Sequence, residues 1–374
     1  QTFRNAWSIE ELRKKILFTL LIVLLYRLGN AVPVPFVDTK ALADYFQASG
    51  LQNTILGLFN VMSGGAFAQA TVFALGVQPY INSSIIIQLL TIAIPSLGRM
   101  AQEGGEEGKK KIQSITRYAT VAIAILQGWG YYALMKNASI LTNTGVWAAL
   151  VIIISFIAGS SFVMWMGEQI DQFGIGNGIS MILFAGIISR IPSLVSALVS
   201  SLASGAIKWY TAILLVLGML LIVVFIVFIT NSERRIPVQY AKRVVGRKQM
   251  GGQNSYLPLK LNMSGVMPII FASAMVSIPG TIGSFLQIDP EAHPVWYTFF
   301  RTFNYTSWLY IVIYLLLILA FNYFYVAIQY NPVEIANNLR RNNGSIPGFR
   351  PGKPTSDFIT RTLNKITLIG AIFL

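Results

Sequence analysis

Few side chains in this sequence are of a type that catalyses reactions. His293 is the one histidine, and there is no cysteine, so thiolate chemistry is excluded. Three glutamates at 103–107 share a glycine-rich stretch with three lysines at 109–111, a mixed run typical of a solvated surface rather than of a buried acid–base pair. The run GIGNG at 174–178 has no P-loop lysine and follows an apolar block rather than a strand, which makes it a weak phosphate site. We therefore predict no enzyme, no cofactor and no metal site.

The composition instead indicates a membrane protein. Of 374 residues, 54% are hydrophobic and 11% are charged, whereas soluble domains carry about 25% charged residues. The apolar residues form blocks of about 20, the length that spans the hydrocarbon core of a bilayer. We predict an all-α polytopic membrane protein.

Eight complete membrane helices are expected, and a ninth begins near residue 359 and continues to Leu374. The eight are expected at 16–36, 72–97, 118–138, 146–167, 174–203, 210–231, 263–286 and 307–328.

The basic residues predict the orientation. With the N-terminus in the cytoplasm, the cytoplasmic segments hold 20 lysines and arginines and the outer loops hold 4. This asymmetry follows the positive-inside rule, and it explains most of the net charge of +14 without a nucleic-acid partner.

Two cytoplasmic loops, 232–262 and 329–358, are longer than the topology requires. Both mix basic residues with glycine and proline turn formers. Arg247, Lys248 and Arg350 stand in or beside glycine-containing turns, where they would suit an acidic protein surface or ribosomal RNA. The alternative is that both loops are solvated anchors.

The stretch GLFNVMSGGAFAQ, 57–69, is apolar but too short to cross a bilayer, and Ser63, Gly64 and Gly65 interrupt it. A non-spanning segment at membrane depth must be buried in protein or line a watery cavity. Small residues and the lack of charge predict close, reversible docking, although a rigid re-entrant element is the alternative.

Two of the expected helices share a pattern. Gly76 stands three residues before Pro79, and Gly265 three before Pro268. Because proline kinks a helix, matching interruptions in two halves indicate an inverted repeat around a central path. Packing kinks are the alternative explanation.

Five motifs in order resemble bacterial SecY, the channel subunits of the Sec protein translocase. They are FNVMSGGAFAQATVFALGVQPYINSSIIIQLL, MWMGEQIDQFGIGNGIS, ERRIPVQYAKR, LPLKLNMSGVMPIIFAS and PGFRPG. The resemblance runs from about residue 10 to Leu374. It implies a bundle of ten helices in two inverted halves, of which about nine are represented here: 1–205 with helices 1–5, and 206–374 with helices 6–9.

The resemblance also implies functional residues. A plug at about 55–70 would include Phe59, Asn60, Met62, Ser63, Gly64, Gly65 and Phe67. An aliphatic pore ring would comprise Val77, Ile81, Ile179, Leu183 and Ile270. A lateral gate would include Asn82, Ile86, Gln127 and Met275. Docking of SecA or the ribosome would use Arg243, Arg247, Lys248 and Arg350.

The implied function is a channel that translocates unfolded secretory polypeptides with signal sequences across the bacterial plasma membrane and inserts membrane helices into it. SecA or the ribosome would supply the energy, and SecE and SecG would be further partners. The alternatives are a small-solute secondary transporter and an insertase without an aqueous path. No Asp or Glu falls within an expected span, which counts against ion-coupled transport, and Arg27 and Arg190 are expected to reach toward the outer interface.

Overall fold

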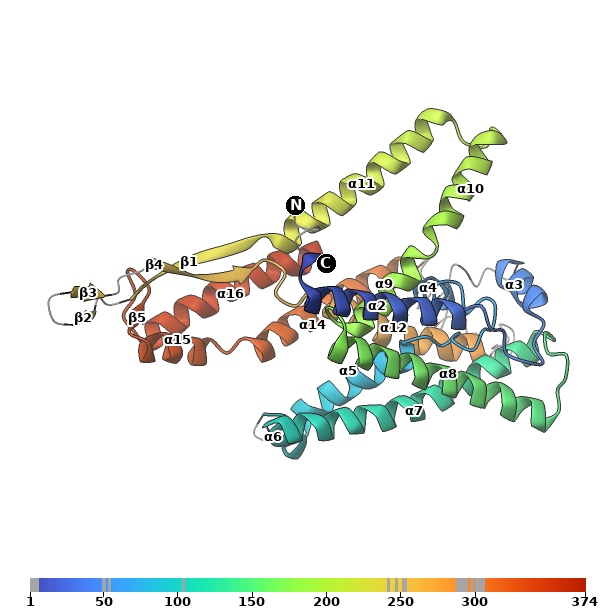
Figure 1. The fold of residues 1–374 in the computed structure, drawn as a ribbon, viewed down its shortest axis with the longest axis horizontal. Coiled ribbons are helices and arrows are strands. Elements are labelled where there is room, and N and C mark those ends of the chain that lie inside the picture. The colour runs from blue at the N-terminus through green and yellow to red at the C-terminus, as the bar shows by residue number, and fades with distance from the viewer. Residues whose placement is uncertain are drawn as a thin grey trace. The chain divides into compact units, whose positions relative to one another are not determined.

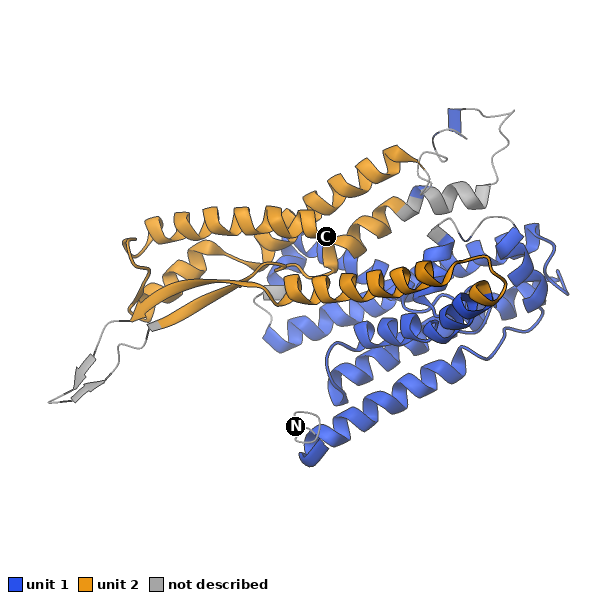
Figure 2. Ribbon diagram, turned by 90° about the horizontal axis from the view of Figure 1, so that it is seen from above, with its two compact units in different colours: residues 1–200, 279–305 blue, residues 201–278, 306–374 orange. Residues whose placement is uncertain are grey.

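The computed structural model describes residues 7–48, 52, 55–102, 105–240, 243–245, 248–250, 254–286, 295–296, 299 and 307–374. The chain forms two compact units, one of residues 1–200 with 279–305 and one of residues 201–278 with 306–374 (Figure 2). The expected division into 1–205 and 206–374 and the inverted relation of the two halves stay predictions.

The first unit is helical (Figure 1). Its helices are α2 (Glu10–Gly29), α3 (Thr39–Ala48), α4 (Ile55–Met62), α5 (Gln78–Ala93), α6 (Pro95–Gln102), α7 (Gly105–Asn137), α8 (Val146–Phe173) and α9 (Gly178–Ile188), and α10 (Ile191–Ala203) continues past its end. α5 packs against both α7 and α8.

Aromatic side chains form the centre of this unit. Tyr131 of α7 and Phe156 of α8 are fully buried, with ring centroids 5.1 Å apart. Gly159 of α8 permits a close backbone approach, because a Cβ there would lie 1.9 Å from the carbonyl oxygen of Val72. This contact positions the segment that leads into α5.

The expected helix at 72–97 is wrong at its start. Residues 63–77 form turns, and α5 begins at Gln78. Gly76 has a φ of +53°, which a right-handed helix does not allow. Pro79 then lies in the first turn of α5, where its missing N–H leaves no bond unmade.

The matching pattern in the second unit behaves in the same way. Gly265 has a φ of +63°, and Pro268 is the second residue of α12 (Met267–Leu286). Both glycine–proline patterns therefore start a helix, and the expected kinks within long helices are wrong at these two prolines.

The expected helix at 174–203 is divided in two. α9 ends at Ile188 and α10 begins at Ile191, with Pro192 in its first turn. Helices predicted from the most continuous apolar blocks agree better, since α11 (Trp209–Asn231) and α14 (Trp308–Gln329) match the expected ranges within one residue.

The second unit adds short strands to a fold that is otherwise all-α, as predicted. Besides α11, α12 and α14 it contains β1 (Glu233–Tyr240), β2 (Arg243–Val245), β3 (Lys248–Met250), β4 (Asn254–Lys260), α15 (Pro332–Arg341), β5 (Gly344–Ser345) and α16 (Lys353–Phe373). β1 lies between β4 and β5 and is antiparallel to both, with Ile236 opposite Leu257 and Gln239 opposite Ser345.

One asparagine connects three segments of this unit. Asn322 of α14 accepts a hydrogen bond from the hydroxyl of Ser264, just before α12, and its Nδ2 donates to the carbonyl oxygen of Thr367 in α16 at 2.8 Å. Asn322 is 2% exposed, so both bonds are made in a dry interior, where losing either partner is costly.

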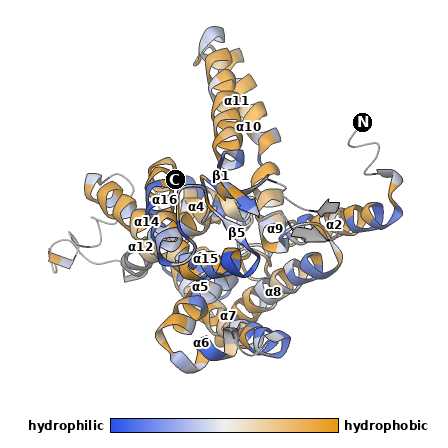
Figure 3. Cartoon of the chain, turned by 90° about the vertical axis from the view of Figure 1, so that its left-hand side faces the viewer, coloured by the Kyte–Doolittle hydropathy of each residue, from blue (hydrophilic) through white to orange (hydrophobic). Residues whose placement is uncertain are grey.

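Four helical stretches in the described part of the chain are long and apolar enough to cross a membrane: Val146–Phe173, Gly178–Ala203, Trp209–Asn231 and Trp308–Arg341. Among the other expected spans, α5 has only 16 residues and α2 carries charged residues in both end turns. All residues of α11 are described, and Ala212 alone is buried. Figure 3 shows the apolar character of α10 and α11; an apolar helix exposed on all sides suits a lipid environment.

Candidate functional site

The broken half-helix predicted from the sequence is α4, which has eight residues. The N–H of Gly65 donates to the carbonyl oxygen of Asn60 at 2.8 Å, the N–H of Gly64 donates to that of Val61 at 3.1 Å, and Gly64 has a φ of +69°. This is a Schellman motif with glycine in the left-handed position. The expected break at Ser63-Gly64-Gly65 is thereby confirmed.

We call residues 55–70 the plug segment. Apolar side chains near both of its ends enter the core of the first unit, where Leu56 is 2% and Phe67 is 4% exposed. The Phe67 ring stacks on Tyr131 of α7 with centroids 4.3 Å apart and meets the edge of Phe46 of α3 at 6.0 Å. The plug segment is thus seated in protein, as a non-spanning segment in a membrane must be.

Side chains in the last turn of α2 donate to the end of α4. Asn30 Nδ2 lies 3.2 Å and the Tyr26 hydroxyl 3.5 Å from the carbonyl oxygen of Ser63, and the Arg27 guanidinium lies 3.5 Å from that of Gly64. A cation at a helix C-terminus is favourable. The sequence did not indicate this contact of Arg27, which was expected only to reach the outer interface.

Further hydrogen bonds shape the segment beyond α4. Asn60 Oδ1 accepts from the N–H of Ala68 at 3.0 Å, and Ser63 Oγ accepts from the N–H of Phe67 at 3.1 Å. The hydroxyl of Tyr131 donates to the carbonyl oxygen of Phe67. Asn60 and Ser63, two of the predicted plug residues, therefore hold the turn between α4 and residue 70 in one shape.

The tip of the plug segment touches the helices that carry four of the predicted pore residues. A Cβ on Gly186 of α9 would lie 2.6 Å from the carbonyl oxygen of Met62, so no larger residue fits there without a shift. The side-chain amide of Gln78 in α5 lies 3.0 Å from Met62 Sδ. Gln78 follows Val77 directly, and Gly186 is three residues beyond Leu183.

The four pore residues of the first unit form two pairs at helical spacing. Val77 is the N-cap of α5 and Ile81 lies one turn later, and both are buried. Ile179 and Leu183 lie one turn apart on α9 and are half-buried. Residues four apart share a helix face. Ile270 is half-buried in α12 of the second unit, and its joining the others in one ring stays a prediction.

The start of α9 is held firmly against α8. Asp171 Oδ1 accepts from the N–H of Gly178 at 2.7 Å, and Asn177 caps the helix by accepting from the N–H of Ser180 at 3.0 Å. A Cβ on Gly178 would lie 1.9 Å from the carbonyl oxygen of Gly167. The Gly-rich run at 174–178 is therefore the lead into a helix, as expected, and it positions Ile179.

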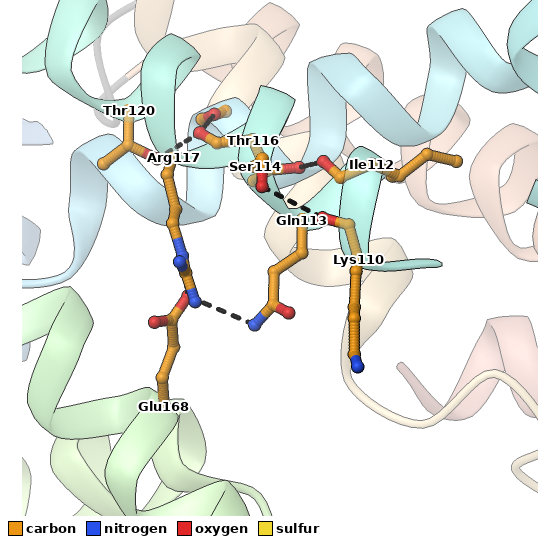
Figure 4. Close-up of polar contacts among 9 residues, drawn as sticks. Lys110, Ile112, Gln113, Ser114, Thr116, Arg117, Thr120 and Glu168 are labelled. Carbon is orange, nitrogen blue, oxygen red and sulfur yellow. Dashed lines mark hydrogen bonds and ion pairs between the residues drawn. The ribbon is translucent and has the colours of Figure 1, made fainter. Parts of the chain in front are cut away.

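A polar cluster that sequence reasoning missed joins α7 and α8. Glu168 Oε1 accepts from Arg117 Nε at 2.8 Å and from Gln113 Nε2 at 3.2 Å (Figure 4). α8 continues to Phe173, beyond the expected end of this helix at residue 167, and so carries Glu168, which lies outside the expected span. Apolar residues continue at helical spacing up to Gly174, and this spacing was the sequence signal for the longer helix.

The predicted gate residues occupy varied environments. In α5, Asn82 is half-buried and Ile86 is 45% exposed; in α7, Gln127 is half-buried. Gln127 Oε1 is buried and has no hydrogen-bond partner among the described residues. Met275 of α12 is 48% exposed. Their assembly into one gate involves both units and stays a prediction.

The predicted docking residues lie in two separate segments of the chain. Arg243 lies on β2 and Lys248 on β3, while Arg247 lies outside the described residues. Arg350 is exposed, and its carbonyl oxygen accepts from the Thr355 hydroxyl at 2.8 Å. The first docking segment is thus a pair of antiparallel strands rather than an irregular loop.

Comparison with known sequences points to one protein family. A family profile described as SecY matches residues 71–374. The protein translocase subunit SecY of Streptomyces coelicolor is 43% identical over 385 residues, which cover 100% of this chain and 86% of that protein. That of Aquifex aeolicus is 39% identical over 377 residues, with 99% and 86% covered.

Solved structures share the fold. The one reported as "The structure of a protein conducting channel" superposes with a TM-score of 0.65 at 16% identity and covers 96% of this chain and 84% of its own. The one reported as "Sec61 in the Canine ribosome-channel complex from the endoplasmic reticulum" has a TM-score of 0.59 at 16% identity, with 96% and 84% covered.

Proposed function

Because the chain belongs to the SecY family, we propose that it opens a polypeptide path when the plug segment leaves an aliphatic ring. The chain is a multi-pass membrane protein and the channel subunit of a protein translocase. One observation carries the proposal: the tip of the plug segment, at Met62, touches α5 beside Val77 and α9 beside Leu183. The plug segment therefore lies against the two helices whose side chains we assign to the seal.

The ring would consist of Val77, Ile81, Ile179, Leu183 and Ile270. Aliphatic side chains offer water and ions no hydrogen bonds, so a narrow ring of them dewets. They also bind no particular peptide sequence, which suits a path for many different polypeptides.

The lateral gate would use the polar groups of α5 and α7. Asn82 and Gln127 would weaken the otherwise apolar seam of this gate. The side-chain oxygen of Gln127, which has no hydrogen-bond partner among the described residues, would gain one if a signal sequence or water entered. The Ser83 hydroxyl of α5 ties the two helices together, because it donates to the carbonyl oxygen of Thr116 in α7 at 2.7 Å. We propose that the two helices move as one body.

Energy would come from partners. SecA or the ribosome would dock on the basic residues Arg243, Arg247, Lys248 and Arg350, with SecE and SecG as further subunits. One solved structure of this fold is a Sec61 ribosome–channel complex, which supports docking of a large cytosolic partner. The excess of basic residues in the segments assigned to the cytoplasm supports a cytoplasmic N-terminus in the bacterial plasma membrane.

Reconstitution tests the proposal. The chain is placed in liposomes with SecE and SecG, and SecA, ATP and a secretory protein are added from outside. We expect protease protection only when ATP and a functional signal sequence are both present. A lack of protection, together with uptake of a small solute by the same liposomes, would favour the transporter instead.

A further inference from the structure

We infer that the last turn of α2 and the hydroxyl of Tyr131 form a two-sided latch on the backbone of the plug segment, and that this latch sets how strong a signal sequence must be to open the channel. The inference rests on the proposed function and adds to it the residues that hold the closed state.

The first side of the latch is one face of α2. Tyr26 and Asn30 are four residues apart and Arg27 lies between them, three before Asn30, so their side chains share a face. All three donate to Ser63 or Gly64, whose carbonyl groups lie where α4 ends. Carbonyl groups at a helix end have no partner within the helix, and α2 supplies the partners.

The environment of Asn30 indicates that its side chain is there to donate a hydrogen bond rather than to fill space. Asn30 is 6% exposed, and its Oδ1 is buried without a hydrogen-bond partner among the described residues. An unpaired buried oxygen is unfavourable, and a leucine of similar size would avoid it. What the amide adds is the bond from Nδ2 to Ser63.

The second side of the latch is Tyr131 of α7. Its ring packs between Phe67 and Phe156, with centroids 4.3 Å and 5.1 Å away, and a phenylalanine would keep both contacts. The hydroxyl adds a bond to the carbonyl oxygen of Phe67. The two sides therefore hold the chain at Ser63 and at Phe67, on either side of the Gly64–Gly65 turn.

A latch made of backbone acceptors can be released reversibly. Such a bond is lost once donor and acceptor separate beyond about 3.5 Å, and water entering from the outer side can replace it. Each bond then favours the closed state by only a few fold. Apolar packing alone would seat the plug segment, while these bonds adjust the fraction of channels that open without a substrate.

Thiol labelling measures that fraction, because the chain has no cysteine of its own. A reporter cysteine replaces Ala66, which is 2% exposed, and the complex with SecE and SecG in lipid nanodiscs is treated with a bulky maleimide. The variants are Asn30→Leu, Tyr131→Phe and the two together. Tyr132→Phe is the matched control, because it removes a hydroxyl from a buried tyrosine one residue away that makes no hydrogen bond to the described residues of the plug segment.

We expect the labelling rate to rise about fivefold in each variant and about 25-fold in the double variant, given the usual strength of one hydrogen bond. Tyr132→Phe should leave it unchanged. In liposomes with SecA, the same variants should export a protein with a weakened signal sequence faster, with little change for an intact one. A second reporter at Leu56, also 2% exposed, guards against a local effect of the first.

Unchanged labelling at both reporters, in variants that assemble as well as the unsubstituted chain, would overturn the latch. An equal rise in Tyr132→Phe would also overturn it, since general loosening would then be the cause. If Asn30→Leu fails to assemble, Tyr131→Phe decides alone. If the unsubstituted chain exports nothing, the proposed function fails, whereas normal export with unchanged labelling removes the latch only.

Discussion

The ion pair between Arg117 and Glu168 predicts an asymmetry between its two partners. The Nε···Oε1 distance is 2.8 Å, but the side chains differ in exposure, at 44% for Arg117 and 6% for Glu168. Removing the arginine leaves a charge in a dry interior with Gln113 as its remaining donor. Removing the glutamate leaves a charge that can turn toward water.

The expected magnitudes follow from these exposures. Breaking a buried pair costs about 3–5 kcal/mol; because Gln113 stays and Arg117 is partly solvated, we expect about 2–4 kcal/mol for Arg117→Met. For Glu168→Gln we expect about 1–2 kcal/mol, the loss of a charge-assisted hydrogen bond. The double variant should regain most of the stability that Arg117→Met loses, since no buried charge remains.

The assay is the thermal unfolding midpoint of the purified complex in detergent. Arg117→Met should have the lowest midpoint and Glu168→Gln an intermediate one, with the double variant close to Glu168→Gln. Lys14→Met, which breaks an exposed pair with Glu10, is the control and should change little. A double variant less stable than Arg117→Met, or a larger loss for Glu168→Gln than for Arg117→Met, would refute the reasoning.

Two further predictions concern close packing in each unit. Gly186→Val should raise the ion conductance of resting channels in a planar bilayer, because its Cβ would lie 2.6 Å from the carbonyl oxygen of Met62. The control is Gly218→Val, where a Cβ meets nothing within 4 Å, and it should leave the conductance unchanged. Equal conductance in both variants would contradict the docking of the plug segment on α9. Asn322→Leu should lower the unfolding midpoint by the equivalent of about 2–4 kcal/mol, since it leaves the hydroxyl of Ser264 and the carbonyl of Thr367 without this partner. The control is Asn337→Leu, because Asn337 is exposed. A midpoint for Asn322→Leu as high as that of the control would count against the role of Asn322.

Continuous apolar blocks allowed good prediction of α11 and α14, whose bounds differ from expectation by one residue at most. The start of α5 was mistaken because residues 63–77 are apolar yet turn-forming, and apolar character does not report a positive φ. The glycine three residues before the proline was the better signal, since Gly76 and Gly265 both have positive φ and precede a helix start.

The strands were missed for a different reason. In β1, Ile236 and Val238 are buried and alternate with exposed Arg235, Pro237 and Gln239, which is the period of a strand. Reading 232–262 only as a loop with turn formers hid this alternation.

The plug segment was predictable, but its polar partners were not. Its lack of charge and its central break are local properties of the sequence. The bonds that hold it join residues 33 apart, Asn30 to Ser63, and 64 apart, Tyr131 to Phe67. No periodicity relates such pairs, and only the packing of α2 and α7 brings them together.

Cross-linking at Ile81 tests most directly whether the aliphatic residues line the polypeptide path. One cysteine replaces Ile81, a second is placed in a secretory protein stalled during export, and oxidation is carried out in membranes with SecA. A matched cysteine at Leu217 of α11, which is 61% exposed, reports contact outside the path. We predict a disulfide at Ile81 that requires both ATP and a signal sequence, and none at Leu217. If no register of the stalled protein reaches Ile81, the assignment of the pore is contradicted.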